Sequence, residues 1–366
     1  MENVIEAAIA AIENKENDSE ILAAKTPKAH IENGCGYVFE EKAESVAAAM
    51  KAARLDWNVI SKPLYYDNPV TNEKDIVSGR FANVREDTGK VLGVVSDRYG
   101  IVSNAMGFEV VDLMMHAGEA HNQISIETAG CLRGGAEVFI SAKFPNKYRI
   151  NTHDDDGGID DYILFRNTHD GSGTVMVLFT PIKVICQNTL SAAMKKAKNK
   201  VSFRHTSYVG DRLSLVDANS RQNMFNILAL HEDFKKEFEE NMQYLREKKL
   251  PQGFSDKDII AFVSKVVCDE AQQKVIADAN FSVDLVSKDL LSTQKRNVIK
   301  RVADTIESGI GQQYDRGTAA WLWNGVTCYS QNVKDWHGDA EKKFSSITDG
   351  PAQDMSVKAH SIVMAM

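Results

Sequence analysis

The residue types of a nucleophilic site occur near the middle of the chain. Asn167 and His169 lie in one segment, and Cys186 and Asn188 lie in the next. A Cys/His/Asn set is nucleophilic when the histidine takes the thiol proton and a positive environment stabilises the thiolate. A hairpin would bring the two segments together, but Cys186 ends an apolar run, where a buried structural cysteine is the commoner outcome. We therefore predict no catalytic residue, and a hydrolase that uses Cys186 with His169 is an alternative.

An acidic segment, His153–Gly158 followed by Asp160 and Asp161, contains the residue types that bind divalent cations. Its spacing is wrong for an EF-hand, and the nine histidines of the chain are scattered, without metal-ligand spacing. A solvated acidic loop is the simpler interpretation. The usual phosphate-loop, dinucleotide-binding, zinc-protease and serine-hydrolase motifs are absent. We expect no metal ion and no cofactor.

The strongest chemical signal is a stretch without acidic residues, from Gly171 to Gly210. Its charge is +6, which leaves −14 for the rest of a chain whose formal net charge is −8. Clustered lysine and arginine bind a nucleic-acid backbone because they release its condensed counterions. The alternative is a solvated helix end, where lysines relieve the helix dipole. The two interpretations carry similar weight.

The turn Arg133-Gly134-Gly135 is a second possible phosphate contact, because the glycines would let a phosphate reach backbone amides. A plain hairpin turn is its default interpretation. His205 adds a partial charge beside Arg204, and Phe203 and Tyr208 could stack on bases. The predicted nucleic-acid-binding residues are Arg133, Lys183, Lys195, Lys196, Lys198, Lys200, Arg204 and His205.

The elements that position these residues follow from periodicity. Alternating apolar residues predict strands at 80–85, 91–95, 124–128 and 136–144. The segments 162–166 and 174–179 are almost continuously apolar and predict central strands. A helix is expected at Asn188–Lys198, with the lysines at its end.

From about Asp211 the pattern is helical. Arg212–Lys249 is long and amphipathic, Ser255–Asp258 is a capping-box start, and Trp321 and Trp323 belong to a buried helix. We therefore predict an α+β protein, with an antiparallel, hairpin-rich sheet and packed helices, followed by a mostly α-helical C-terminal domain. The expected division is an acidic extension (1–42), a core domain (43–210) and a helical domain (211–366).

Composition excludes several classes of protein. The five cysteines are odd in number and far apart, which argues against a disulfide framework or a zinc ribbon. The N-terminus lacks the basic start of a signal peptide, and no apolar run approaches the ~20 residues of a membrane span. The sequence indicates a protein of the cytoplasm without membrane attachment.

Several ordered segments carry a resemblance to a known family. They are Trp57, Asp97–Tyr99, Thr128–Gly135, Asn167–Ser172, Thr180–Leu190, Arg204–Thr206, Thr318–Trp321 and Asn324–Thr327. The chain resembles the phage/plasmid-like proteins of the domain of unknown function nine-three-two, from about residue 40 almost to the C-terminus. The resemblance implies a mobile genetic element and a host cytoplasm, and no activity established for the family comes with it.

The hairpins followed by a basic-edged helix are similar in outline to single-strand annealing proteins, which act as rings without catalytic residues; fold outline alone does not set function. We expect a non-enzymatic homo-oligomer that binds single-stranded DNA in recombination or replication. The alternative is a protein-interaction or anti-defence factor that uses the helical C-terminal half.

Overall fold

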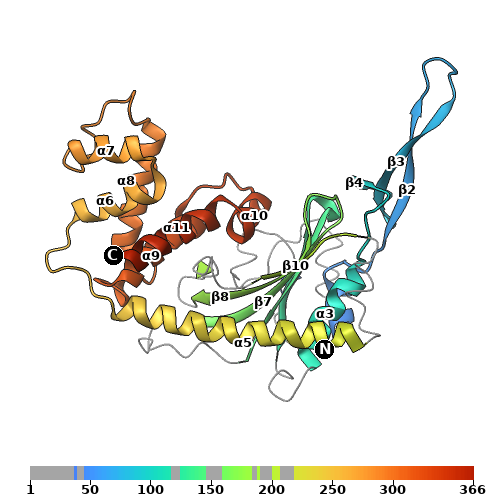
Figure 1. Ribbon diagram of the computed structural model, residues 1–366, viewed down its shortest axis with the longest axis horizontal. Coiled ribbons are helices and arrows are strands. Elements are labelled where there is room, and N and C mark those ends of the chain that lie inside the picture. The colour runs from blue at the N-terminus through green and yellow to red at the C-terminus, as the bar shows by residue number, and fades with distance from the viewer. Residues whose placement is uncertain are drawn as a thin grey trace. The chain divides into compact units, whose positions relative to one another are not determined.

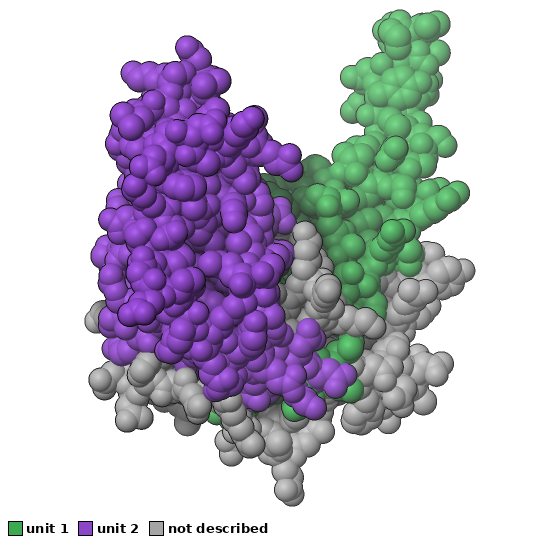
Figure 2. All heavy atoms as spheres, turned by 60° about the vertical axis from the view of Figure 1, so that its left-hand side comes forward, with its two compact units in different colours: residues 1–145, 161–179, 199–232 green, residues 146–160, 180–198, 233–366 purple. Residues whose placement is uncertain are grey.

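The computed structural model describes residues 37–38, 45–116, 124–145, 159–183, 188–189, 200–206 and 218–366. It is an α+β structure whose helices lie mostly in the C-terminal half, as predicted (Figure 1). The chain forms two compact units. Unit 1 comprises residues 1–145, 161–179 and 199–232, and unit 2 comprises residues 146–160, 180–198 and 233–366 (Figure 2). The sequence division into 1–42, 43–210 and 211–366 stays a prediction.

The larger sheet has the strand order β1-β5-β6-β7-β8-β10, and β9 pairs with β8. Its strands are β1 (Tyr37–Val38), β5 (Ser125–Leu132), β6 (Glu137–Lys143), β7 (Ile159–Thr168), β8 (Val175–Lys183), β9 (Asn188–Thr189) and β10 (Lys200–Phe203). Strands β5 and β6 pair antiparallel with one register shift between Ile126 and Thr128, and β6 and β7 pair antiparallel in continuous register. Nearly every residue of β6 and β7 is buried, which confirms the central position expected of apolar strands.

Two helices contact β7 at positions four residues apart and hence on one face of the sheet. Phe108 of α3 (Asn104–His116) meets Phe165 edge to face, at 5.9 Å between ring centroids. His231 of α5 (Ala218–Glu247) bonds Asp161, with 2.9 Å between Nε2 and Oδ2. Phe144 and Phe179 flank the His231 ring at centroid distances of 4.1 and 4.8 Å. The polar pair is therefore enclosed by aromatic rings within unit 1.

A three-stranded antiparallel sheet completes unit 1, with β3 between β2 and β4. It follows α2 (Val46–Ala52) and consists of β2 (Val59–Asp67), β3 (Lys74–Arg85) and β4 (Val91–Ser96). Gly93 of β4 lies against the chain at Asp170, because a Cβ there would be 2.5 Å from the Asp170 Cα atom. Only glycine permits this approach.

Unit 2 is helical and is built around α9 (Ala319–Cys328), all of whose residues are buried. The helices α8 (Thr293–Ser308) and α11 (Pro351–Ala365) pack against it. The helix α6 (Asp256–Val267) packs against both of these, α7 (Glu270–Asp278) packs against α6, and α10 (Ala340–Asp349) packs against α11. A π-helical turn, Tyr329–Val333, continues α9. The Trp323 indole donates to Ser356 Oγ of α11 at 3.1 Å. This arrangement confirms the core role predicted for Trp323.

Close contacts fix the helix packing in unit 2. Gly325 of α9 crosses α8 so closely that a Cβ would lie 2.6 Å from the Ile306 Cα atom. At the start of α6 the Asp258 carboxylate accepts a hydrogen bond from the Ser255 N–H at 2.8 Å, as the predicted capping box requires. It also accepts a hydrogen bond from the Ser255 hydroxyl at 2.7 Å. These hydrogen bonds lower the pKa of Asp258. None of the described helices is both long and apolar enough to cross a membrane.

Candidate functional site

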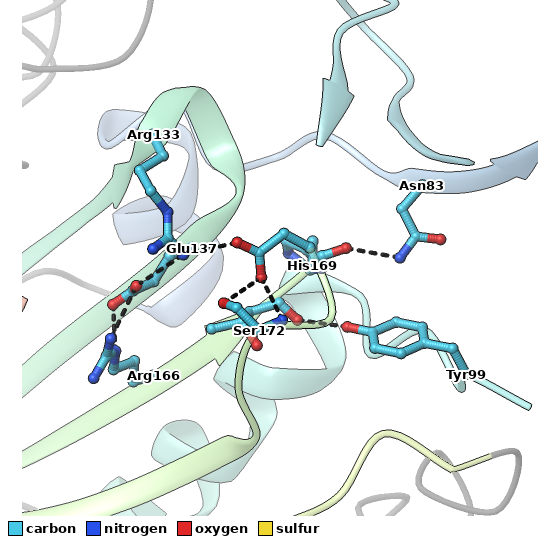
Figure 3. A network of polar contacts seen from close by, with 9 residues as sticks. Asn83, Tyr99, Arg133, Glu137, Arg166, His169 and Ser172 are labelled. Atoms are coloured by element: carbon cyan, nitrogen blue, oxygen red, sulfur yellow. Dashed lines mark hydrogen bonds and ion pairs between the residues drawn. The ribbon is translucent and has the colours of Figure 1, made fainter. Parts of the chain in front are cut away.

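Five segments that carry the family resemblance meet at the end of β7 in unit 1. They contain Trp57, Tyr99, Arg133, the run Thr168–Ser172 and His205. Figure 3 shows the polar contacts that Tyr99 and Arg133 make with the end of β7. We call this group the β7 junction. It lies where the three-stranded sheet contacts the larger sheet, because Gly93 and Asn83 of the smaller sheet touch Asp170 and His169.

Side chains from distant segments hold the backbone at the end of β7. The Tyr99 hydroxyl donates to the Thr168 carbonyl at 2.6 Å, and the Asn83 amide donates to the His169 carbonyl at 2.7 Å. The His169 N–H donates to the Ala136 carbonyl at 2.7 Å. Buried backbone groups need such partners, so this part of the junction stabilises the fold.

Contacts around Asn104 determine which ring nitrogen of His169 carries the hydrogen. The Asn104 amide NH₂ donates to the carbonyls of Leu55 (2.9 Å) and Trp57 (3.3 Å), so its oxygen faces His169 Nε2 at 3.0 Å. Nε2 must therefore carry the hydrogen, and Nδ1 has the lone pair. Burial lowers the pKa of His169 to about 3, so the ring is neutral at pH 7. The side chain is fully enclosed, with no solvent access.

Asp170 belongs to a series of ion pairs that also includes Arg133, Glu137 and Arg166. Its Oδ1 accepts from the Ser172 N–H (2.9 Å) and hydroxyl (2.6 Å), and its Oδ2 pairs with Arg133 at 3.0 Å. Arg133 also reaches the buried Glu137 at 3.3 Å, and Glu137 pairs with Arg166 of β7. Two carboxylates thus compensate the charge of Arg133, whose side chain is 43% exposed.

The Arg133 turn has the conformation that its glycines predict. Arg133, Gly134 and Gly135 have φ angles of 53°, 68° and 101°. A Cβ on Gly135 would lie 3.0 Å from the Trp57 ring. This confirms the turn, while a phosphate contact at Arg133 stays a prediction.

His205 connects a second segment to the junction. Its ring stacks on Tyr99 at 4.5 Å, and Nδ1 lies 3.0 Å from the Gly100 carbonyl, to which it donates. Burial lowers the pKa of His205, so we place a neutral ring here in place of the partial charge expected from sequence. Burial also raises the pKa of Tyr99.

The stack places Arg98 and Arg204 on adjoining segments. Both are exposed, and neither forms an ion pair with a described residue.

The predicted lysines are only partly described. Lys183 ends β8 and Lys200 begins β10, where it pairs with Leu178. Lys195, Lys196 and Lys198 lie outside the described residues. The helix expected from Asn188 is wrong at its start, because Asn188 and Thr189 form β9, opposite Lys183 and Ile182. Backbone pairing with β8 satisfies these residues and overrides the helical pattern.

The acidic segment ends in a strand. Asp160 and Asp161 begin β7 and are 7% and 0% exposed, so the prediction of a solvated loop is wrong for them. Across the part of the chain that the structure describes, no group of three His, Cys, Asp or Glu side chains could hold a metal ion. Cys186 lies outside that part, and the Cys186/His169 hydrolase stays a prediction.

Sequence reasoning missed four polar residues of the network around the junction: Asn83, Asn104, Glu137 and Arg166. The available signal was a polar residue inside an otherwise apolar strand, as in Phe81–Arg85 and Glu137–Lys143. Buried polar residues need partners. Sequence alone does not say which segment supplies them.

Comparison with known proteins identifies a family without an assigned activity. No curated protein and no solved structure matched the chain. The family model described as Domain of unknown function (DUF932) matches residues 91–348, well over half of the chain, including the β7-junction residues Tyr99, Arg133, His169 and His205. The chain belongs to the family Domain of unknown function (DUF932).

Proposed function

We propose that this protein binds single-stranded DNA through basic side chains beside the β7 junction and promotes strand annealing without catalysis. It would act as an oligomer in the recombination or replication of a phage or plasmid, in the host cytoplasm. The observation that carries the proposal is the Tyr99–His205 stack, which brings the exposed Arg98 and Arg204 onto adjoining segments.

The charge pattern favours a polyanion as the ligand. Arg204 is the last arginine or lysine in a stretch of 40 residues without a carboxylate side chain, Gly171–Gly210, in a chain of net charge −8. A local cationic strip in an acidic protein attracts phosphates, while the remaining surface repels them. Lysines of the same stretch, Lys195, Lys196 and Lys198, would extend the contact. Arg133 contributes less, because Asp170 and Glu137 already compensate its charge.

The test is charge reversal at the two free arginines. The double variant Arg98→Glu/Arg204→Glu should bind a labelled oligothymidine at least about 10-fold more weakly at ~0.1 M salt. The slope of log affinity against log salt should fall by roughly 1.4, since each single-strand phosphate contact contributes about 0.7. Fluorescence anisotropy across a salt series gives both values. Annealing of two complementary labelled strands should slow in parallel.

The control changes the net charge by the same amount elsewhere. Lys257→Glu/Lys274→Glu reverses two exposed lysines on α6 and α7 of unit 2. This variant should keep nearly wild-type affinity and salt slope. Unchanged binding in the arginine variant, or an equal loss in both variants, would exclude the proposed surface.

A further inference from the structure

The three-stranded sheet exposes an unusual amount of apolar surface. Twelve large hydrophobic side chains of the described residues are exposed, and six of them lie between β2 and β4. They are Tyr65 (54% exposed), Tyr66 (48%), Val70 (88%), Ile76 (59%), Val91 (57%) and Val94 (50%). We call residues 59–96 the arm. Figure 1 shows its β2–β3 ribbon extending away from the larger sheet of unit 1.

One face of the arm is already used inside unit 1. Asn83 bonds the His169 carbonyl, Gly93 lies against Asp170, and Gly171 lies against Val95. Exposed valines lie on the opposite face, where Val94 pairs across strands with the buried Ala82 and Val91 pairs with Val84. Antiparallel sheets with one packed face usually present polar residues on the other, so exposed valines indicate a second contact.

The end of the ribbon is a defined turn. The Asn68 side chain accepts from the Val70 N–H at 2.9 Å and donates to Asp75 at 2.6 Å. The Asn68 N–H donates to the Glu73 carbonyl at 2.8 Å. Tyr65 and Ile76 stand opposite one another in the register, each more than half exposed. Polar contacts therefore set this turn, and its apolar side chains remain available.

Charge along the ribbon is segregated. Near its base are the exposed cations Lys62 and Arg80, with a charge of +2. At its tip, Asp67, Glu73 and Asp75 with Lys74 give a charge of −2. The arm as a whole, residues 59–96, has five basic and five acidic residues and is neutral, which does not suit a nucleic acid. Its two ends complement one another when a second ribbon lies antiparallel to it.

We infer that two copies of this chain associate through their arms about a two-fold axis, with the tip of each arm against the base of the other. A two-fold contact requires a self-complementary surface, and an acidic tip with a basic base provides one. The exposed valines and tyrosines supply the apolar area that a stable interface buries. This inference goes beyond the DNA-binding proposal and does not rest on it.

The test uses two charge-reversed chains. A tip variant, Asp67→Lys/Glu73→Lys, makes both ends basic, and a base variant, Lys62→Glu/Arg80→Glu, makes both ends acidic. Light scattering after size exclusion, without DNA, should give the wild type twice the 40.6 kDa of one chain. Each variant alone should run as a monomer of 40.6 kDa, since its like-charged ends repel. A mixture of the two variants should restore the dimer, because each end again meets its opposite.

Several results would overturn the inference: a wild type that stays monomeric at about 100 µM, single variants that keep the wild-type mass, or a mixture that fails to associate. Circular dichroism of each variant confirms that the substitutions, all at exposed positions, leave the fold intact. The variant Arg98→Glu/Arg204→Glu should keep the dimer mass. Loss of DNA binding and loss of association are thereby measured separately.

Discussion

Tyr99 and His205 stack with ring centroids 4.5 Å apart and planes only 12° apart. The same tyrosine donates its hydroxyl to the Thr168 carbonyl, and the same histidine donates to the Gly100 carbonyl. The pair thus connects the chain after β4, the end of β7 and the chain after β10. Arg98 and Arg204 each precede one ring of the stack in sequence, so this contact brings their two segments together.

Tyr99→Phe should lower the free energy of unfolding by about 1 kcal/mol, because it removes one hydrogen bond and keeps the ring. Tyr99→Ala should also weaken single-stranded DNA binding, since the segment that bears Arg204 loses its stacking partner. Urea unfolding and anisotropy check the two effects. The control is Tyr244→Phe, at a 45% exposed tyrosine on α5, which should change stability by less than about 0.5 kcal/mol. Equal losses at both positions would contradict the prediction.

The stability of the protein should fall as pH drops below 6.5, in part because of His169. Its pKa is about 3 in the folded protein, so the unfolded chain takes up a proton that the folded chain does not. The resulting loss, between pH 6.5 and about 3, is at most about 1.4 kcal/mol per pH unit for this group. His205 acts in the same direction, because burial lowers its pKa too.

Urea unfolding at pH 7.5 and pH 5.5 tests the role of His169. His169→Gln removes the titrating group, so the stability difference between the two pH values should be smaller than in the wild type. His337→Gln, at a histidine whose side chain is 85% exposed, should leave the wild-type difference unchanged. The prediction fails when His169→Gln retains the full pH dependence.

The buried pair His231–Asp161 should be sensitive to loss of either partner. The two side chains are 2% and 0% exposed, with 2.9 Å between Nε2 and Oδ2. Asp161→Ala leaves a buried imidazole without its acceptor and should cost about 3 kcal/mol. Asp161→Asn should cost less, because the amide oxygen can still accept. Thermal or urea unfolding measures both variants.

The neighbouring Glu232 provides the control for this pair. Its carboxylate lies 3.7 Å from His231 Nδ1 and its side chain is 68% exposed. Glu232→Gln should change stability by less than about 1 kcal/mol, since exposed ion pairs contribute little. A loss as large as that of Asp161→Ala would mean that burial is not what makes Asp161 important.

Local pattern predicted much of the fold. Alternation located the strands around Arg80–Arg85 and Ala136–Phe144, and unbroken apolar runs located the central strands β7 and β8. The Ser255–Asp258 capping box marked the start of α6. These features depend on residues within one element, so a single segment of sequence contains the necessary information.

The β7 junction could be predicted only in part. The sequence offered Arg133, His169 and His205 as separate candidates and Tyr99 only within a segment of the family resemblance, and nothing in their spacing says that they meet. Asn188–Thr189 became a strand because β8 supplied backbone partners. In the same way, Asp160 and Asp161 became buried because they begin β7, where α5 brings His231 to Asp161.

The sequence by itself determined the α+β class, the family, and the acid-free stretch that carries the predicted DNA-binding charge. The tertiary structure decided which basic side chains are exposed and which are already compensated by ion pairs. Arg133 is compensated by Asp170 and Glu137, whereas Arg98 and Arg204 are exposed beside a stacked Tyr99 and His205. The physical reason is that net charge follows from composition, while compensation and exposure depend on contacts between residues far apart in the chain.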